Sequence, residues 1–201
     1  MTGQKEYSAR LTGEPFLYFE LKQVAKLKLN GFSDQEINKK VRDENLFQYK
    51  TDKSTGKILS AVLERVSVLD ETLLNILING PAESSKLVAI FAVTKVNRLF
   101  EEFMTEVYRE KIINGELVLT PGDFSVFFTH KGEQSSQVAG WKDYTLKKLS
   151  WVYARILMEA GLINNTKEKK LTPPVFDRDL QDHLIAGGNL SFIDALTGGK
   201  Y

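Results

Sequence analysis

The stretch PFLYFELKQVAKLKLNGFSDQEINKKVRDE, residues 15–44, decides the fold class. Its first half, from about Pro15 to Asn30, places apolar residues on one face of a 3.6-residue period, which predicts an amphipathic helix. Gly31 can end that helix in the left-handed conformation. Ser33 followed by Glu36 matches a capping box, which predicts that a second helix starts there. Two helices joined by a three-residue turn predict an all-α fold.

Further helices are expected after this pair. A third should run from about Ser54 to Leu69, and this order resembles a helix-turn-helix, whose last helix presents its N-terminal end to the major groove of DNA. Helices are also predicted from about 82 to 113, and a short aromatic helix should start at the cap residues 120–123. We divide the chain into an N-terminal helix-turn-helix-like region, residues 1–80, and a C-terminal helical region, residues 81–201.

The last third predicts a basic helix, a hairpin and a short helix. Apolar residues from about Lys142 to Ala160 fall on one helix face, and Gly161 ends that helix. Residues 162–171 contain a turn-prone Asn-Asn pair and predict a small hairpin of the winged-helix kind with a basic tip. A final helix is expected near Arg178 to Ala186, followed by a mobile tail. Residues 131–140, which are polar and rich in Gly, Gln and Ser, predict a loop.

Composition favours a soluble, cytoplasmic protein. The 201 residues are 42% hydrophobic, which is enough for a core, and they include no cysteine, which excludes disulfides, thiolate metal sites and cysteine nucleophiles. The polar N-terminus lacks the apolar segment of a signal peptide. The longest uninterrupted apolar run, Leu87 to Val93, is far shorter than the roughly 20 residues that a membrane-spanning helix needs.

Positive charge is concentrated in two regions, although the net charge is only +1. Residues 22–57 and 142–170 each carry four more basic than acidic side chains, whereas residues 64–110 carry three more acidic than basic ones. Such asymmetry is typical of a chain with phosphate-binding surfaces.

Two candidate DNA-binding sites follow from the basic regions. The first combines a helix face that could lie in the major groove, about 12 Å wide, with a hairpin tip that reaches neighbouring phosphates. Its residues are Lys147, Lys148, Trp151, Arg155, Lys167, Lys169 and Lys170. The second surrounds the N-terminus of the third helix, where backbone N–H groups favour a phosphate. Its residues are Lys50, Lys53, Ser54, Thr55 and Lys57. The plainer alternatives are a solvated basic face with Trp151 packed against another element, and an ordinary polar loop.

No pattern in the chain indicates catalysis, a metal or a cofactor. His130 and His183 lie far apart and lack a second ligand at helical spacing, so neither a metal site nor a catalytic triad is predicted. Asp177, Asp179 and Asp182 could in principle hold Mg²⁺, but acids at the start of a helix are ordinary. Walker-type and dinucleotide-binding glycine patterns are absent. We therefore expect a protein that is not an enzyme.

Short motifs spread along the chain resemble the BrxA family of the BREX phage-exclusion system. They are Tyr7-Ser-Ala-Arg-Leu-Thr-Gly13, Glu20 with Val24-Ala25, Asn30-Gly-Phe-Ser33, Glu44-Asn-Leu-Phe-Gln48, Trp141, Thr145, Lys148-Leu149 and Glu159-Ala-Gly-Leu-Ile163. The resemblance implies a small all-helical protein, sometimes likened to NusB-type antitermination factors and carrying a helix-turn-helix, that binds double-stranded DNA and works with other BREX proteins. The family has in places been called an inner-membrane protein, which the absence of a long apolar run here contradicts.

The leading hypothesis is a non-enzymatic subunit that binds duplex DNA mainly through phosphates. Weak sequence preference is expected, because lysine is a point charge whereas arginine can pair with guanine through two bonds. Where the family's helix-turn-helix tends to be rich in arginine, this chain has Lys50, Lys53 and Lys57, with Glu64 nearby. The alternatives are an assembly adaptor that binds an acidic partner protein, a NusB-like RNA-binding protein and an undetected Mg²⁺ nuclease.

Overall fold

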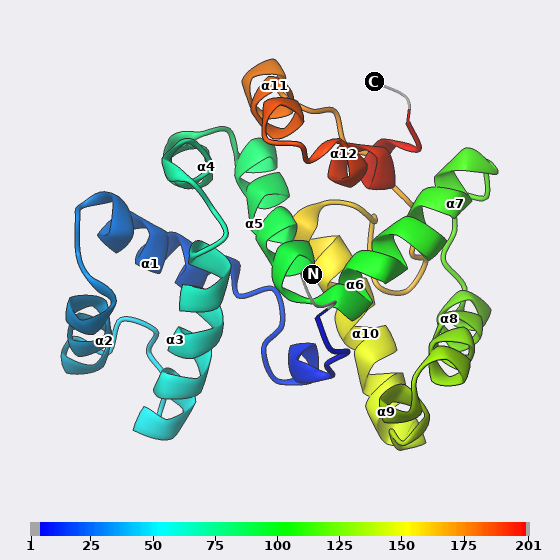
Figure 1. Ribbon diagram of the computed structural model, residues 1–201, viewed down its shortest axis with the longest axis horizontal. Helices are drawn as coiled ribbons and strands as arrows, with labels where there is room; N and C mark the ends of the chain where they lie inside the picture. Colours follow the sequence, from blue (N-terminus) through cyan, green and yellow to red (C-terminus); the bar gives the residue numbers. More distant parts are fainter. Residues whose placement is uncertain (1–4, 200–201) are drawn as a thin grey trace. The chain divides into compact units, whose positions relative to one another are not determined.

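The computed structural model describes residues 5–199, which fold into helices joined by turns and loops. Two isolated β-bridges pair short extended segments between the helices. The predicted all-α class is confirmed. The chain forms two compact units (Figure 1). Unit 2 is the continuous segment Phe16–Val96, and unit 1 joins the N-terminal arm, up to Pro15, to the segment from Asn97 onward.

Unit 2 contains five helices. They are α1 (Tyr18–Leu29), α2 (Asp34–Asp43), α3 (Asp52–Val66), α4 (Glu71–Asn79) and α5 (Ala82–Val96). The start signals predicted for α2 are present, because Ser33 and Glu36 form the complete capping box and Gly31 adopts a φ of +83°. Helix α4 follows an N-cap at Asp70 that we did not predict.

The core of unit 2 forms where α5 and α1 contact α3 and α4. The apolar run Leu87–Val93 is buried on all sides of α5, which is why this helix shows no amphipathic pattern. Arg65 is also buried, and its Nη1 donates to the Phe16 carbonyl at 2.7 Å. Because α4 packs on α5, the compact unit extends to Val96, beyond the division that we predicted between residues 80 and 81.

Unit 1 is built from shorter helical elements. They are the 3-10 turn η1 (Arg10–Thr12), α6 (Arg98–Phe103), the π-helical turn η2 (Met104–Tyr108), α7 (Arg109–Ile113), α8 (Pro121–Gln134), α9 (Ser136–Ala139), α10 (Asp143–Ala160), α11 (Arg178–Ala186) and α12 (Leu190–Thr197). Helix α8 begins with the predicted capping box between Thr120 and Asp123. Helix α10 ends, as predicted, at Gly161 with φ +83°. Aromatic rings of Phe100, Phe103 and Phe128 surround the buried ring of Tyr153 on α10.

Two predictions for unit 1 are wrong. The loop predicted at residues 131–140 is instead the last turn of α8 followed by α9, which Ser135 caps. The tail predicted to be mobile beyond Gly187 contains α12, which buries Phe192, Ile193 and Leu196 against η2 and α7. In both cases tertiary burial stabilises helices in sequence that is rich in turn-forming residues.

Candidate nucleic-acid interface

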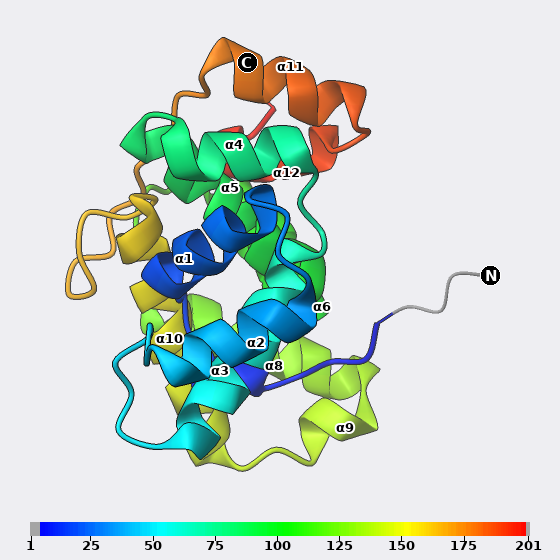
Figure 2. The same cartoon turned by 90° about the vertical axis from the view of Figure 1, so that its left-hand side faces the viewer.

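Three short extended segments of unit 1 pair with one another. Residues 169–172 lie between residues 117–119 and residues 162–164, joined by antiparallel bridges from Val118 to Lys170 and from Ile163 to Leu171. Backbone hydrogen bonds of 2.9 to 3.0 Å connect the segments on both sides. The chain between 162 and 171 is therefore the predicted hairpin, and it projects as an open loop at the left of Figure 2. The order in this part of unit 1 is α7, a short extended segment, α8, the four-residue α9, α10 and the hairpin.

Two asparagines organise the hairpin tip, which we define as residues 164–170. The side-chain oxygen of Asn164 accepts from the N–H groups of Asn165 and Lys170 at 2.7 and 3.0 Å. The side-chain oxygen of Asn165 accepts from the N–H groups of Lys167 and Glu168 at 2.9 and 2.8 Å. These bonds satisfy backbone donors that the turn exposes. The tip therefore holds Lys167, Lys169 and Lys170 on an ordered turn.

Four residues of the first candidate set lie on α10. Lys147, Lys148, Trp151 and Arg155 follow one another at helical spacing, so they share one face of the helix, opposite the buried Leu149 and Tyr153. We call these four residues, with Tyr144 described below, the α10 face. Trp151 is 56% exposed, so the alternative that it packs against another element is wrong.

The cations of the α10 face differ in their freedom to bind a ligand. Arg155 already forms an ion pair, because its Nε lies 2.6 Å from a carboxylate oxygen of Glu159. Its guanidinium also lies 5.5 Å from the centre of the Trp151 ring. Within the described residues, no carboxylate lies at ion-pair distance from Lys147 or Lys148. These two lysines keep their charge available for an anionic partner.

Tyr144 belongs to the same face, and our sequence interpretation missed it. Its side chain is 72% exposed in the first turn of α10, seven residues before Trp151. Seven residues are close to two helical turns, so the two aromatic side chains point in nearly the same direction. The spacing of seven between two aromatics on a basic helix is the signal that could have revealed it.

The second candidate set lies at the start of α3 in unit 2, and one of its members is not accessible. Thr55 is 4% exposed, and its hydroxyl donates to the Thr51 carbonyl, so including it in a binding site is wrong. Thr51 already caps the helix by accepting the Ser54 N–H at 3.2 Å. Asp52, in the first turn, forms an ion pair with Arg42 and places negative charge where a phosphate would sit. Lys50, Lys53 and Lys57 are exposed around this helix start.

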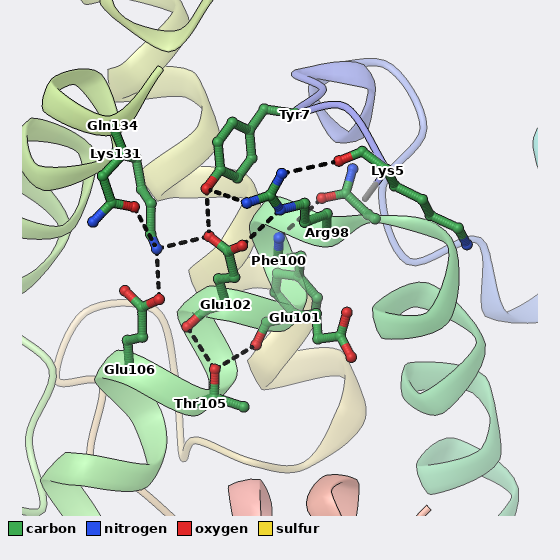
Figure 3. Close-up of polar contacts among 11 residues, drawn as sticks. Lys5, Tyr7, Arg98, Phe100, Glu101, Glu102, Thr105, Glu106, Lys131 and Gln134 are labelled. Atoms are coloured by element: carbon green, nitrogen blue, oxygen red, sulfur yellow. Dashed lines mark hydrogen bonds and ion pairs between the residues drawn. The ribbon is translucent and has the colours of Figure 1, made fainter. Parts of the chain in front are cut away.

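A buried ion-pair network joins α8 to α6 and η2 (Figure 3). Lys131 of α8 is 2% exposed, and its Nζ lies 2.7 Å from Glu102 and 2.5 Å from Glu106. Burial disfavours the charged ammonium, but hydrogen bonds to these two carboxylates outweigh it and raise the pKa of Lys131. The π-helical turn η2 carries Glu106, four residues after Glu102, so both acids meet one cation.

The same network anchors the N-terminal arm (Figure 3). The Tyr7 hydroxyl donates to Glu102 at 2.8 Å, and the Arg98 guanidinium lies 4.1 Å from the Tyr7 ring centre. Burial favours the protonated form of Glu102, yet hydrogen bonds from Lys131, Arg98 and Tyr7 lower the pKa of its carboxyl. The network therefore joins the arm, α6 and α8, the elements that support α10.

The hairpin is tied to the helical core by one further buried bond. The Tyr108 hydroxyl, at the end of η2, donates to the Leu162 carbonyl at 3.0 Å. Burial raises the pKa of this hydroxyl, which stays protonated and able to donate.

A hollow of about 420 Å³ lies between α8, α9 and the start of α10, lined by Trp141, Asp143 and Lys147 among others. Among residues 5–199 we find no group of three side chains that could hold a metal ion.

Comparison with known proteins identifies the family. The model of the BrxA family matches residues 5–188. A curated relative, the BREX protein BrxA of Bacillus cereus (strain H3081.97), is 39% identical over 199 residues, which cover 98% of this chain and 100% of the relative. The chain belongs to the BrxA family. The resemblance stated from short motifs is thereby confirmed.

A solved structure shares the fold of this BrxA-family chain. It is the crystal structure of an uncharacterized protein from Magnetospirillum magneticum, with a TM-score of 0.83 and 19% identity, covering 97% of this chain and 100% of that one. At this identity the likeness concerns the fold alone. Over the part of the chain that the structure describes, no helix combines the length and apolar character needed to cross a membrane.

Several residues that carry the resemblance to BrxA have visible structural roles. Tyr7 donates into the buried network, Ser33 caps α2, and Gly161 ends α10 in the left-handed conformation. Trp141 lines the hollow beside α10. The BrxA motifs therefore include arm, cap and turn positions that build the two units.

Proposed function

We propose that this chain is a non-enzymatic DNA-binding component of a BREX phage-defence system, acting with other BREX proteins. The α10 face and the hairpin tip bind duplex DNA largely through its phosphates. The observation that carries the proposal is the order of elements in unit 1. Helix α7, a short extended segment, α8, the four-residue α9, α10 and a hairpin follow one another in an order similar to that of a winged helix, and the proposal assigns α10 as the recognition helix and residues 162–171 as the wing.

The charges of this arrangement support the proposal. Lys147 and Lys148 lie on the exposed side of the recognition helix, and the wing carries Lys167, Lys169 and Lys170 on an ordered turn. A recognition helix in the major groove leaves a wing free to reach neighbouring phosphates. Lysine supplies charge without two-bond pairing to a base, so the proposed binding has weak sequence preference.

The number of free lysines sets the expected salt dependence. Each phosphate contact contributes about −0.9 to the slope of log affinity against log salt concentration. Five contacts from the α10 face and the hairpin tip therefore give a slope of about −4.5, or about 500-fold weaker binding at 200 mM than at 50 mM salt.

The test measures binding of purified protein to labelled duplex DNA, duplex RNA and an acidic protein across a salt series. Replacing Lys167, Lys169 and Lys170 together with glutamine should reduce the slope by about 2.7. A charge-matched control replaces Lys50, Lys53 and Lys57, and it should leave the slope unchanged. Absence of DNA binding at micromolar protein, a preference for RNA, or equal losses in the two triple variants would contradict the proposal.

A further inference from the structure

Two exposed aromatic rings accompany the cations of the α10 face. Tyr144 is 72% exposed and Trp151 is 56% exposed, and seven residues separate them along one helix. Their side chains therefore start about 10.5 Å apart along the helix axis and within about 20° of each other around it. Among the described residues, Phe19 in unit 2 is the one other aromatic side chain exposed to this degree.

The surroundings of the two rings are positively charged. Lys147 and Lys148 lie between them on the helix and are not paired with carboxylates in the described chain. Arg155, paired with Glu159, lies over the Trp151 ring, 5.5 Å from its centre, and Trp151 is still 56% exposed. The ligand that fits alternating rings and ammonium groups presents flat apolar surfaces linked by anions, which is the chemistry of a nucleic-acid strand.

Ring faces distinguish a paired strand from an unpaired one. Paired bases present only their edges in a groove, whereas unpaired bases offer their faces for stacking on aromatic side chains. The separation of about 10.5 Å between the two side chains equals about three nucleotide steps of 3.4 Å. Tyr144 and Trp151 could thus stack on bases near the two ends of a short unpaired stretch, with Lys147 and Lys148 near the intervening phosphates.

We propose that the two aromatic rings of the α10 face bind unpaired bases, so that the preferred substrate is DNA in which a duplex adjoins a single-stranded segment. Tyr144 and Trp151 stack on the bases of that segment, and the lysines of the hairpin tip bind phosphates of the adjoining duplex. This inference rests on the DNA-binding function proposed above and adds the class of substrate to it.

The test compares three labelled DNA molecules: a blunt duplex, the same duplex with a single-stranded extension, and the extension alone. The affinity should be highest for the extended duplex. Replacing Tyr144 or Trp151 with alanine should weaken binding of that molecule about 5- to 150-fold and weaken binding of the blunt duplex much less, because the blunt duplex offers no unpaired base to stack on these rings. Phe19→Ala removes an equally exposed ring from unit 2 and should have no effect.

Intrinsic fluorescence gives a second readout. The chain has two tryptophans, so the Trp141→Phe variant leaves Trp151 as the single reporter. Stacking of a base on Trp151 should quench this emission when the single-stranded extension is added, and much less when the blunt duplex is added. Trp151→Tyr and Tyr144→Phe retain an aromatic ring and should restore most of the affinity that the alanine variants lose.

The outcomes separate this inference from the function on which it rests. Equal affinity for blunt and extended duplex, or alanine variants that weaken both equally, overturns the unpaired-base site. The DNA-binding function still stands in that case if the hairpin lysine variants lose salt-dependent duplex binding. Failure of the unaltered protein to bind any of the three DNA molecules contradicts both proposals.

Discussion

Replacing Lys131 with methionine removes the buried ammonium between Glu102 and Glu106 and keeps most of the apolar stem. Breaking a fully buried ion pair costs about 3–5 kcal/mol, because the remaining charge is left unpaired. The side chains of Glu102 and Glu106 are 21% and 47% exposed, so water restores part of their solvation, and Arg98 still contacts Glu102. We therefore expect a loss of about 2 kcal/mol in the free energy of unfolding. For a chain of this length, that loss lowers the melting midpoint by about 4–8 °C.

The same substitution should have a pH dependence with a definite sign. Glu102 has a pKa below its ordinary 4.5 in the folded protein, despite burial, because Lys131, Arg98 and Tyr7 donate to it. A carboxylate with a lowered folded pKa contributes stability above its unfolded pKa and loses it as the pH falls through the folded pKa. The difference in free energy of unfolding between the Lys131→Met variant and the unaltered protein should therefore be largest at neutral pH and decrease as the pH falls below about 4.5.

Urea denaturation followed by far-ultraviolet circular dichroism at several pH values measures this difference. Lys147→Met is the matched control, because it makes the same chemical change at an exposed lysine of unit 1 and should alter stability by less than about 0.5 kcal/mol. The reasoning is refuted if Lys131→Met destabilises the protein no more than Lys147→Met does, or if the difference is the same at pH 3 and pH 7.

Three further substitutions test local features of unit 1. Thr120→Ala removes the cap of α8 and should cost about 1 kcal/mol in urea denaturation, whereas Thr120→Ser should cost little. Gly161→Val places a branched side chain at φ +83° and should cost 1 kcal/mol or more; Gly161→Asn should cost less, since asparagine tolerates this conformation. Tyr108→Phe removes one of the two hydrogen bonds that the Leu162 carbonyl accepts and leaves the one from the Thr172 N–H, so it should cost about 1 kcal/mol, with faster amide hydrogen exchange in the hairpin; an unchanged exchange rate would show that this bond does not hold the hairpin.

The starts and ends of helices were the most predictable part of the fold. Ser33, Thr120 and Gly161 act through hydrogen bonds or backbone angles within a few residues, so their neighbours in sequence contain the information. The basic face of α10 was predictable for the same reason, because helical periodicity alone separates Lys147 from the buried Leu149.

Features that depend on distant partners were not predictable in this way. Gly132 and Ser135 are typical of a loop. Helix α8 nevertheless continues through Gly132 to Gln134, because Lys131 is buried against Glu102 and Glu106, more than twenty residues earlier. The misplaced Thr55 has a different cause. Thr55 lies four residues before Leu59 and seven before Val62, so it shares their buried face of α3, and this spacing predicts its burial. Its position near the start of α3 led us to treat it as exposed.

The division of the chain into units has a consequence for its synthesis on the ribosome. Unit 2 is one continuous segment, so all of it has been synthesised by the time Val96 is added, and we expect it to fold first. The arm that precedes it contributes Tyr7 to the network with Arg98, Glu102 and Lys131, none of which exists at that moment. The residues translated earliest are thus expected to reach their final positions only after a later part of the chain has been translated, so an incomplete chain exposes an arm that has not yet found its partners.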